Sequence, residues 1–186
     1  MSPKPEKLPD NDTYYMRIAM AARDKANCTG NRVGAVVVLQ NRVISTGYNG
    51  VPENMKNCLQ GGCLRCQNPG GRFPSGTGYD LCICVHAEQN ALLTAARFGI
   101  AVNEATIYST MQPCFGCAKE LLQAKVKRVV YLHPWPPTDP DAEMERLKKA
   151  EYEKLCARLD SKHLPIHDPR AEWAVTKLRK KPGVES

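Results

Sequence analysis

Two short motifs, each at a position where a helix is expected to begin, constrain the fold of this chain most strongly. The first is His-Ala-Glu at residues 86–88, and the second is Pro-Cys-Phe-Gly-Cys at residues 113–117. Apolar side chains recur after each motif with the helical period of 3.6 residues, so each motif lies at a helix N-terminus. A fold that brings both N-termini to one edge of a sheet would place these polar side chains close together.

The order of the expected elements predicts an α/β fold. A three-layer α/β/α sandwich with a central mixed sheet of about five strands accounts for strands that alternate with helices after an initial hairpin. Asp12 or Thr13 is expected to cap the first helix, Asn41 and Arg42 to form the hairpin turn, and Gly99 to close the helix of the first motif. The helices are expected at residues 14–26, 86–98 and 114–124, and the strands at 33–40, 43–50, 105–110 and 126–132.

The last fifty residues have a weaker pattern. A charged amphipathic helix is expected at residues 141–159, a short fifth strand at 163–167 and a final basic helix at 171–181. The polar, proline-rich residues 1–12 are expected to be a disordered leader, and they show neither a secretory signal nor a transit pattern. Residues 51–84 lose all periodicity and are rich in glycine, proline and cysteine, which indicates a long insertion.

Composition narrows the chemistry. No apolar run approaches the roughly 20 residues that a membrane helix needs, and with no export signal we expect a cytoplasmic protein rather than a membrane protein. Nine cysteines in a reducing compartment favour metal binding or thiolate chemistry over disulfides. The net charge of +7 suits a partner that carries phosphate, either a nucleotide or a nucleic acid.

The two motifs together have the composition of a catalytic zinc site. Cys114 and Cys117 are three residues apart at a helix start, where free amide groups favour thiolates, and His86 adds a third ligand. Three protein ligands leave a fourth position for water, and Glu88 is then placed to move protons. The simpler alternatives are a surface glutamate, a core histidine and a Cys-x-x-Cys pair used for redox chemistry or structure.

The sequences "HAEQNALL" and "TMQPCFGCAKELL" resemble the cytidine deaminase superfamily of zinc enzymes, whose signature they contain. With "VGAVVV" and "ISTGYNG", the chain is most similar to the deoxycytidylate (dCMP) deaminases, including the competence-operon type. The resemblance covers residues 14–132 and implies a zinc-dependent deaminase domain, which we expect at 13–167, followed by a C-terminal helix and basic tail at 168–186.

The resemblance implies a hydrolase that acts on a cyclic amidine C–N bond and converts dCMP to dUMP and ammonia, supplying dUMP for thymidylate synthesis. His86, Cys114 and Cys117 would hold the zinc, Glu88 would act as base and then as acid, and the Ala87 backbone would contact the pyrimidine. Asn49 would contact the sugar, although Asn-Gly is also a common turn dipeptide. Relatives are often homohexamers that bind dCTP and dTTP as effectors, but "VPENMKNC" at residues 51–58 departs from their pattern.

Some relatives also carry a structural zinc that ties the end of the first helix to the insertion. Cys28 and Cys58 match those positions, and the remaining ligands are expected from Cys63, Cys66, Cys82 and Cys84, so that four of six candidates would hold one ion. The alternative is a set of buried, inert cysteines. Cys156 is expected only to pack.

Three other functions fit the motifs less well. A tRNA adenosine deaminase uses the same zinc chemistry, but such enzymes usually have "EPC" where this chain has Gln112-Pro-Cys, and "GHN" where it has "GYN". We therefore do not expect nucleic acid as a partner. Another cytosine nucleotide deaminase and a non-catalytic zinc module remain as alternatives. Arg97 and Arg128 are candidates for phosphate binding by charge alone.

Overall fold

The computed structural model describes residues 8–73, 77–135, 137–139 and 141–174. Residues 1–7 of the expected leader and 175–186 of the expected tail lie outside this part. The α-helices and strands are α1 (Asn11–Arg23), β1 (Gly34–Leu39), β2 (Arg42–Tyr48), α2 (Leu64–Gln67), α3 (Ala87–Arg97), β3 (Thr106–Met111), α4 (Phe115–Gln123), β4 (Arg128–His133), α5 (Ala142–Cys156) and β5 (Asp160–His163). Short 3₁₀ turns are η1 (Cys58–Gln60), η2 (Pro69–Gly71), η3 (Tyr79–Leu81) and η4 (Ala171–Ala174).

The five strands form one mixed sheet in the order β2-β1-β3-β4-β5. β1 pairs antiparallel with β2 and with β3, whereas β3–β4 and β4–β5 are parallel. The hairpin turn is at Gln40 and Asn41, both with positive φ, one residue earlier than predicted. Because β3 and β4 are parallel, their carboxyl ends meet at one edge, where α4 begins.

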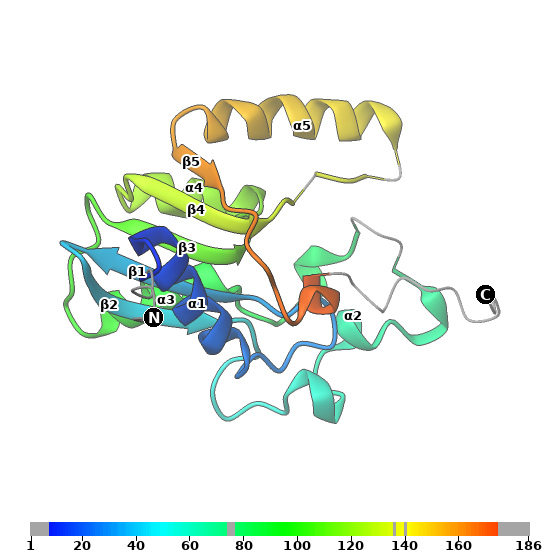
Figure 1. Cartoon of the computed structure of the whole chain (residues 1–186). Coiled ribbons are helices and arrows are strands. Elements are labelled where there is room, and N and C mark those ends of the chain that lie inside the picture. The colour runs from blue at the N-terminus through cyan, green and yellow to red at the C-terminus, as the bar shows by residue number, and fades with distance from the viewer. Residues whose placement is uncertain (1–7, 74–76, 136, 140, 175–186) are drawn as a thin grey trace, which may run out of the picture.

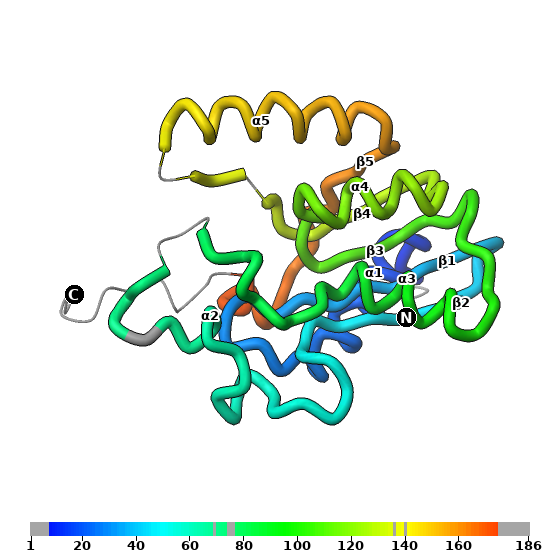
Figure 2. Tube along the Cα trace, turned by 180° about the vertical axis from the view of Figure 1, so that it is seen from behind, coloured from blue at the N-terminus to red at the C-terminus, as the bar shows by residue number. Residues whose placement is uncertain are grey.

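Both faces of the sheet are covered, so the predicted three-layer sandwich is confirmed (Figures 1 and 2). Side chains along each strand alternate between the two faces. Val36 and Tyr108 pack with Met16 of α1 in one core, whereas Val37 and Ile107 point to the opposite core. That second core contains apolar side chains of α3, α4 and α5.

Several helix and strand boundaries that were predicted near the two ends of the chain were wrong. The first helix begins at Asn11, because Asp10 rather than Asp12 or Thr13 is the cap and accepts a hydrogen bond from the Thr13 amide at 2.8 Å. Residues 8–12 are therefore not all a disordered leader. The fifth strand is Asp160–His163 and ends where it was predicted to begin. Within the expected last helix, residues 171–174 form a 3₁₀ turn.

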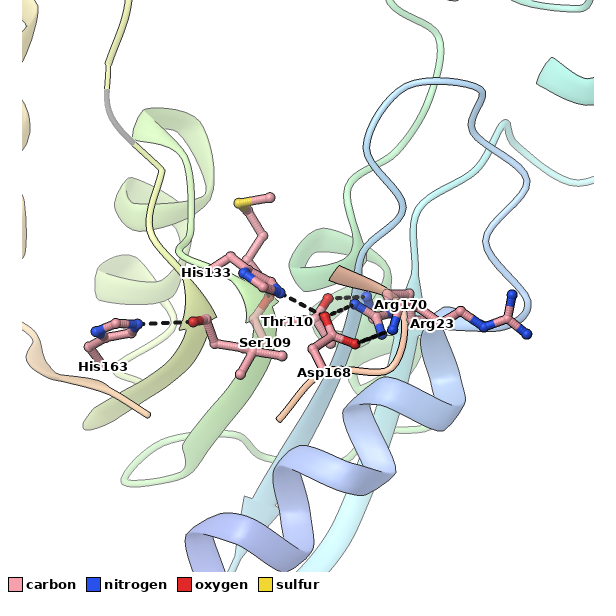
Figure 3. Close-up of polar contacts among 10 residues, drawn as sticks. Arg23, Ser109, Thr110, His133, His163, Asp168 and Arg170 are labelled. Atoms are coloured by element: carbon pink, nitrogen blue, oxygen red, sulfur yellow. Dashed lines mark hydrogen bonds and ion pairs between the residues drawn. The ribbon is translucent and has the colours of Figure 1, made fainter. Parts of the chain in front are cut away.

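The chain that follows β5 returns toward α1 (Figure 1), and Asp168 of this segment lies beside Arg23 of α1 (Figure 3). Asp168 receives two hydrogen bonds from the Arg23 guanidinium, at 2.6 and 2.8 Å, and lies 2.7 Å from Nε2 of His133 at the end of β4. Burial acts to raise the pKa of Asp168, but the bonds from Arg23 and His133 outweigh it and hold the pKa well below its usual range. This cluster joins the C-terminal segment to two layers of the fold.

The cysteine-rich insertion lies beside the sheet, at the end away from the β1–β2 turn (Figure 1). Its cysteines form a separate buried cluster, distinct from the two cores of the sheet. Among the described helices, none has both the length and the apolar character needed to cross a bilayer.

Candidate active site

Two helix N-termini meet at the carboxyl edge of β3, as the motifs predicted. His86 is the N-cap of α3, and Cys114 is the N-cap of α4, with Cys117 in the first turn. The approach to α3 is fixed by paired backbone bonds between Val85 and Gly50, at 2.8 and 3.2 Å. The approach to α4 is fixed by a 2.7 Å bond from the Gln112 amide to the His133 carbonyl.

His86, Cys114 and Cys117 form a compact set of three metal donors. Nδ1 of His86 lies 3.3 Å from Sγ of Cys114 and 3.4 Å from Sγ of Cys117, and all three donor atoms are within 4.8 Å of one another. Zinc at the usual distances of about 2.1 Å from nitrogen and 2.3 Å from sulfur would separate tetrahedral donors by roughly 3.6 Å. The donor types and their spacing therefore fit zinc, with one position left for another ligand.

The charges in this set also suit a cation. The hydrogen bond from Cys117 lowers the pKa of Cys114 to about 4. The Cys114 thiolate in turn raises the pKa of His86 to about 9, against the opposing effect of burial. A thiolate thus faces Nδ1 at the point where a divalent cation would replace a proton.

Glu88 lies beside the donors but is not placed as one of them. Its side chain is 4% exposed, and Oε1 accepts a 3.1 Å hydrogen bond from the Ser109 hydroxyl. Oε2 lies 3.7 Å from Sγ of Cys117. Burial raises the pKa of Glu88, which favours a carboxyl group that both takes up and releases protons. The sequence analysis did not single out Ser109. Side chains two residues apart in a strand share a face, so Ser109 lies on the same face of β3 as Ile107 and Met111, which is the face that α3 covers.

These residues border a cleft with two adjoining parts, of about 480 and 110 Å³. His86 and Cys114 line both parts, and Ala87, Glu88 and Asn49 line the smaller one. Other side chains of the wall come from several separate elements and loops, so no single motif indicated them. They include Arg65 of α2, Tyr79 of η3, Gln112, Phe115 of α4, Trp135 and Lys148 of α5.

The predicted substrate contacts are close to the donors. Ala87 is fully buried in the first turn of α3. The Asn49 side chain accepts a 2.8 Å hydrogen bond from the Val33 amide and donates one of 2.8 Å to the Asn31 carbonyl. These bonds fix the loop after β2, and they leave Asn49 with a second amide hydrogen for another partner.

Neither arginine proposed from charge lies at the cleft. Arg128 begins β4, at the opposite end of the sheet, and forms two hydrogen bonds with Asp12, at 2.8 and 2.9 Å. Arg97 ends α3, roughly 15 Å from its start at 1.5 Å per residue. Neither Arg97 nor Arg128 therefore lines the cleft of its own chain, and their binding of phosphate stays an untested prediction.

The insertion brings all six of its candidate cysteines together. Cys28 and Cys58 group with Cys66 and Cys84, and a second group consists of Cys63, Cys66, Cys82 and Cys84. Cys156 is remote from them, half-buried on α5. Each group supplies four sulfur donors, so the expectation of four ligands from six candidates stays a prediction.

Known proteins resemble this chain in sequence and in fold. The family model for the cytidine and deoxycytidylate deaminase zinc-binding region matches residues 9–133. Deoxycytidylate deaminase of Saccharomyces cerevisiae is 42% identical over 127 residues, which cover 68% of this chain and 39% of that protein. Deoxycytidylate deaminase of Mycobacterium phage D29 is 39% identical over 128 residues, covering 66% of this chain and 94% of that protein.

A crystal structure shows the same fold. The dCMP deaminase of the cyanophage S-TIM5, in apo form, matches with a TM-score of 0.60 and 25% sequence identity, over 85% of this chain and 100% of that chain. The chain spans less than half the length of the yeast relatives that it matches.

Proposed function

Because the chain belongs to the cytidine and deoxycytidylate deaminase family, we propose that it hydrolyses dCMP to dUMP and ammonia. One observation carries the proposal: a buried carboxyl group, Glu88, lies beside three zinc-type donors in the wall of a cleft. The named relatives act on dCMP, by their names.

The residues of the cleft account for the chemistry. His86, Cys114 and Cys117 would hold zinc, which when bound lowers the pKa of water enough to supply a nucleophile near neutral pH. Glu88 takes one proton from the attacking water and delivers it to N3 of the ring. It then takes the remaining proton from the new C4 hydroxyl and delivers it to the amino group, so that the C4–N bond breaks, the C4 carbonyl forms and ammonia leaves. The Ser109 hydroxyl orients Glu88 through the 3.1 Å bond to Oε1.

Substrate contacts follow from the same wall. The Ala87 backbone would face the pyrimidine, and the second amide hydrogen of Asn49 would reach the sugar. Two cationic side chains line the cleft among the described residues, Arg65 and Lys148. Lys148 already pairs with Asp139, so Arg65 is the stronger candidate for the phosphate.

Family resemblance supports further proposals about the whole enzyme. The insertion binds structural metal through its cysteines, and the chain acts in the cytoplasm as a homohexamer that responds to dCTP and dTTP. Light scattering of the purified chain, with and without these nucleotides, measures the assembly, and turnover at fixed dCMP measures the response. A monomer with unchanged turnover would contradict both statements.

The substrate is tested by a direct comparison. We expect dUMP and ammonia from dCMP, with much lower kcat/KM for dCTP, deoxycytidine, cytidine and a tRNA anticodon stem. A preference for the RNA would replace the proposal with tRNA adenosine deamination. A lack of turnover on all of them, with zinc bound, would favour a non-catalytic zinc module.

The role of Glu88 gives a sharper prediction. Glu88→Gln keeps the shape of the side chain but cannot accept a proton, so kcat should fall by about 10²- to 10⁴-fold. Zinc content, measured by plasma mass spectrometry, should not change, because Glu88 is not a ligand. Glu120→Gln, at an exposed carboxylate that does not line the cleft, is the control. Full activity in Glu88→Gln would refute the proton-transfer role.

A further inference from the structure

Five buried cysteines and the half-buried Cys82 form one cluster of sulfur atoms, which we call the six-cysteine cluster. Its members lie after α1, in the insertion and in the segment that leads to α3: Cys28, Cys58, Cys63, Cys66, Cys82 and Cys84. Four of the sulfurs lie within 4.8 Å of one another in one group, and so do four in a second group. Both groups contain Cys66 and Cys84.

The distances match metal–thiolate geometry. Four sulfurs around one zinc ion at about 2.3 Å are separated by roughly 3.8 Å. Cys28–Cys66 is 3.7 Å, and the pairs Cys63–Cys82, Cys66–Cys82 and Cys66–Cys84 are each 3.9 Å. The Cys58–Cys84 pair is closer, at 2.9 Å, but well beyond the bond of about 2.05 Å in a disulfide.

We propose that the six-cysteine cluster binds two zinc ions that share the thiolates of Cys66 and Cys84. Cys28 and Cys58 complete the tetrahedron of the first ion, and Cys63 and Cys82 complete that of the second. This inference rests on the structural metal site proposed above and changes its stoichiometry. It is independent of the reaction at Glu88.

Two ions explain the cluster better than one. A single tetrahedral ion would use four sulfurs and leave two without a ligand role, either Cys28 and Cys58 or Cys63 and Cys82. Cys58 and Cys63 are both fully buried, so neither reaches water in place of a metal. With two shared thiolates, every sulfur has a ligand role, and two divalent cations balance more of the thiolate charge than one.

The cluster also supports the active site. Cys82 and Cys84 line the same cleft as His86, and Cys84 precedes His86 by two residues. Between them, Val85 is fixed to Gly50 by the paired backbone bonds. Two ions in the insertion would therefore hold one wall of the cleft and the segment that carries His86.

Metal analysis of the full-length chain tests the proposal. We expect three zinc ions per chain, one at His86 and two in the cluster. After replacement of zinc by ¹¹³Cd, two of the three NMR resonances should show mutual scalar coupling, because shared sulfurs connect those two ions. Two zinc ions per chain, or three resonances without coupling, would overturn the shared pair. One zinc ion would overturn any structural metal.

Variants assign the ligands. Cys63→Ser should lose one zinc ion and the coupling while the other cluster ion remains, and Cys58→Ser should do the same at the other ion. Cys66→Ser should lose both, and Cys156→Ser, outside the cluster, should keep three. Retention of three ions by Cys63→Ser would overturn the assignment. If a variant does not fold, the ¹¹³Cd coupling in the unaltered chain still decides.

The proposed reaction and the proposed two-zinc cluster can be refuted independently of each other. Glu88→Gln should retain all three ions and the coupling, because Glu88 lies outside both sulfur groups. An inactive chain with three ions would reject dCMP deamination and support the cluster. An active chain with only one or two ions would support dCMP deamination and reject the two-zinc cluster.

Discussion

Gly47 of β2 lies against the first turns of α3, the helix that carries Glu88. A Cβ atom at this position would lie 2.1 Å from the Ala87 carbonyl oxygen and 2.5 Å from the Ala91 amide nitrogen. Both are backbone atoms, which do not move aside as a flexible side chain does. The absence of a side chain at Gly47 thus sets how closely α3, and Glu88 with it, approaches the sheet.

Gly47→Ala is expected to force α3 away from β2. The free energy of unfolding should fall by about 1–3 kcal/mol, the usual cost of inserting a methyl group into a packed core. The value of kcat should also fall, because Glu88 moves with the helix. Urea denaturation and dCMP turnover measure the two effects. Gly116→Ala is the stability control, since Gly116 is within α4 and a Cβ there would meet no atom within 4 Å apart from its chain neighbours and the backbone of its own helix. Equal loss in both variants would contradict the close-contact explanation.

Arg65 is expected to bind the substrate phosphate. Its guanidinium stacks 4.5 Å from the centre of the Tyr79 ring and donates to the Thr77 carbonyl, which holds the charge at the cleft. Arg65→Ala should raise KM for dCMP by about 10- to 100-fold, the effect of losing one bond to a charged group. Turnover of deoxycytidine, which lacks the phosphate, should not change.

Arg97→Ala is the matched control for Arg65→Ala, because Arg97 lies at the far end of α3. Its KM for dCMP should equal that of the unaltered chain. An equal loss on dCMP and deoxycytidine in Arg65→Ala would instead indicate a structural role. Zinc content then shows whether the neighbouring Cys66 has been disturbed.

At the scale of elements, a buried ion pair joins the C-terminal segment after β5 to α1. Arg23 and Asp168, on α1 and this segment, are 1% and 3% exposed, so neither charge has water as an alternative partner. Asp168→Asn leaves the Arg23 charge buried without its counter-ion. The free energy of unfolding should fall by about 3–5 kcal/mol.

Urea denaturation measures the loss in Asp168→Asn, with Glu104→Gln as the matched control. Glu104 pairs with Lys127, but the two side chains are 65% and 68% exposed, so that pair should contribute about 0–1 kcal/mol. Similar losses in the two variants would show that Asp168 acts through the segment's shape rather than through its charge.

In the whole molecule, one carboxylate connects α1 to the far edge of the sheet and makes stability depend on pH. Asp12 accepts hydrogen bonds from Arg128 of β4, from Lys162 of β5 and from the Tyr108 hydroxyl of β3. The Arg128 guanidinium, with Lys162 and Tyr108, holds the pKa of Asp12 well below its unfolded value of about 3.9.

A lowered pKa in the folded state stabilises the fold above the unfolded pKa. That contribution is lost as the pH falls through about 4 toward the folded pKa, where both states are protonated. Asp12→Asn should therefore be less stable than the unaltered chain at about pH 7, and the difference should narrow at about pH 3. Urea denaturation at both pH values measures it. Acid also releases metal, but from both chains alike. A difference that widens in acid would contradict this account.

The prediction of the fold was correct where local chemistry decided it. Apolar periodicity located α3, α4 and the hairpin, and Gly99 closes α3 with a φ of +67°, as predicted. The prediction failed where two neighbouring residues were equally good candidates for the same role. Asp10 and Asp12 are both good N-caps, but Asp12 is drawn to Arg128, a residue 116 positions away, which leaves Asp10 as the cap.

The sequence by itself determined the order of elements and the candidate metal donors His86, Cys114 and Cys117, because helix N-termini, ligand types and motif spacing are local properties. Only the tertiary structure decided which distant side chains meet. Ser109 reaches Glu88, Asp168 reaches Arg23 across 145 residues, and Cys28 joins Cys66. Such contacts depend on how helices and loops pack on the sheet, and no spacing along the chain encodes that packing. The grouping of six cysteines around two shared sulfurs belongs to this second kind of information.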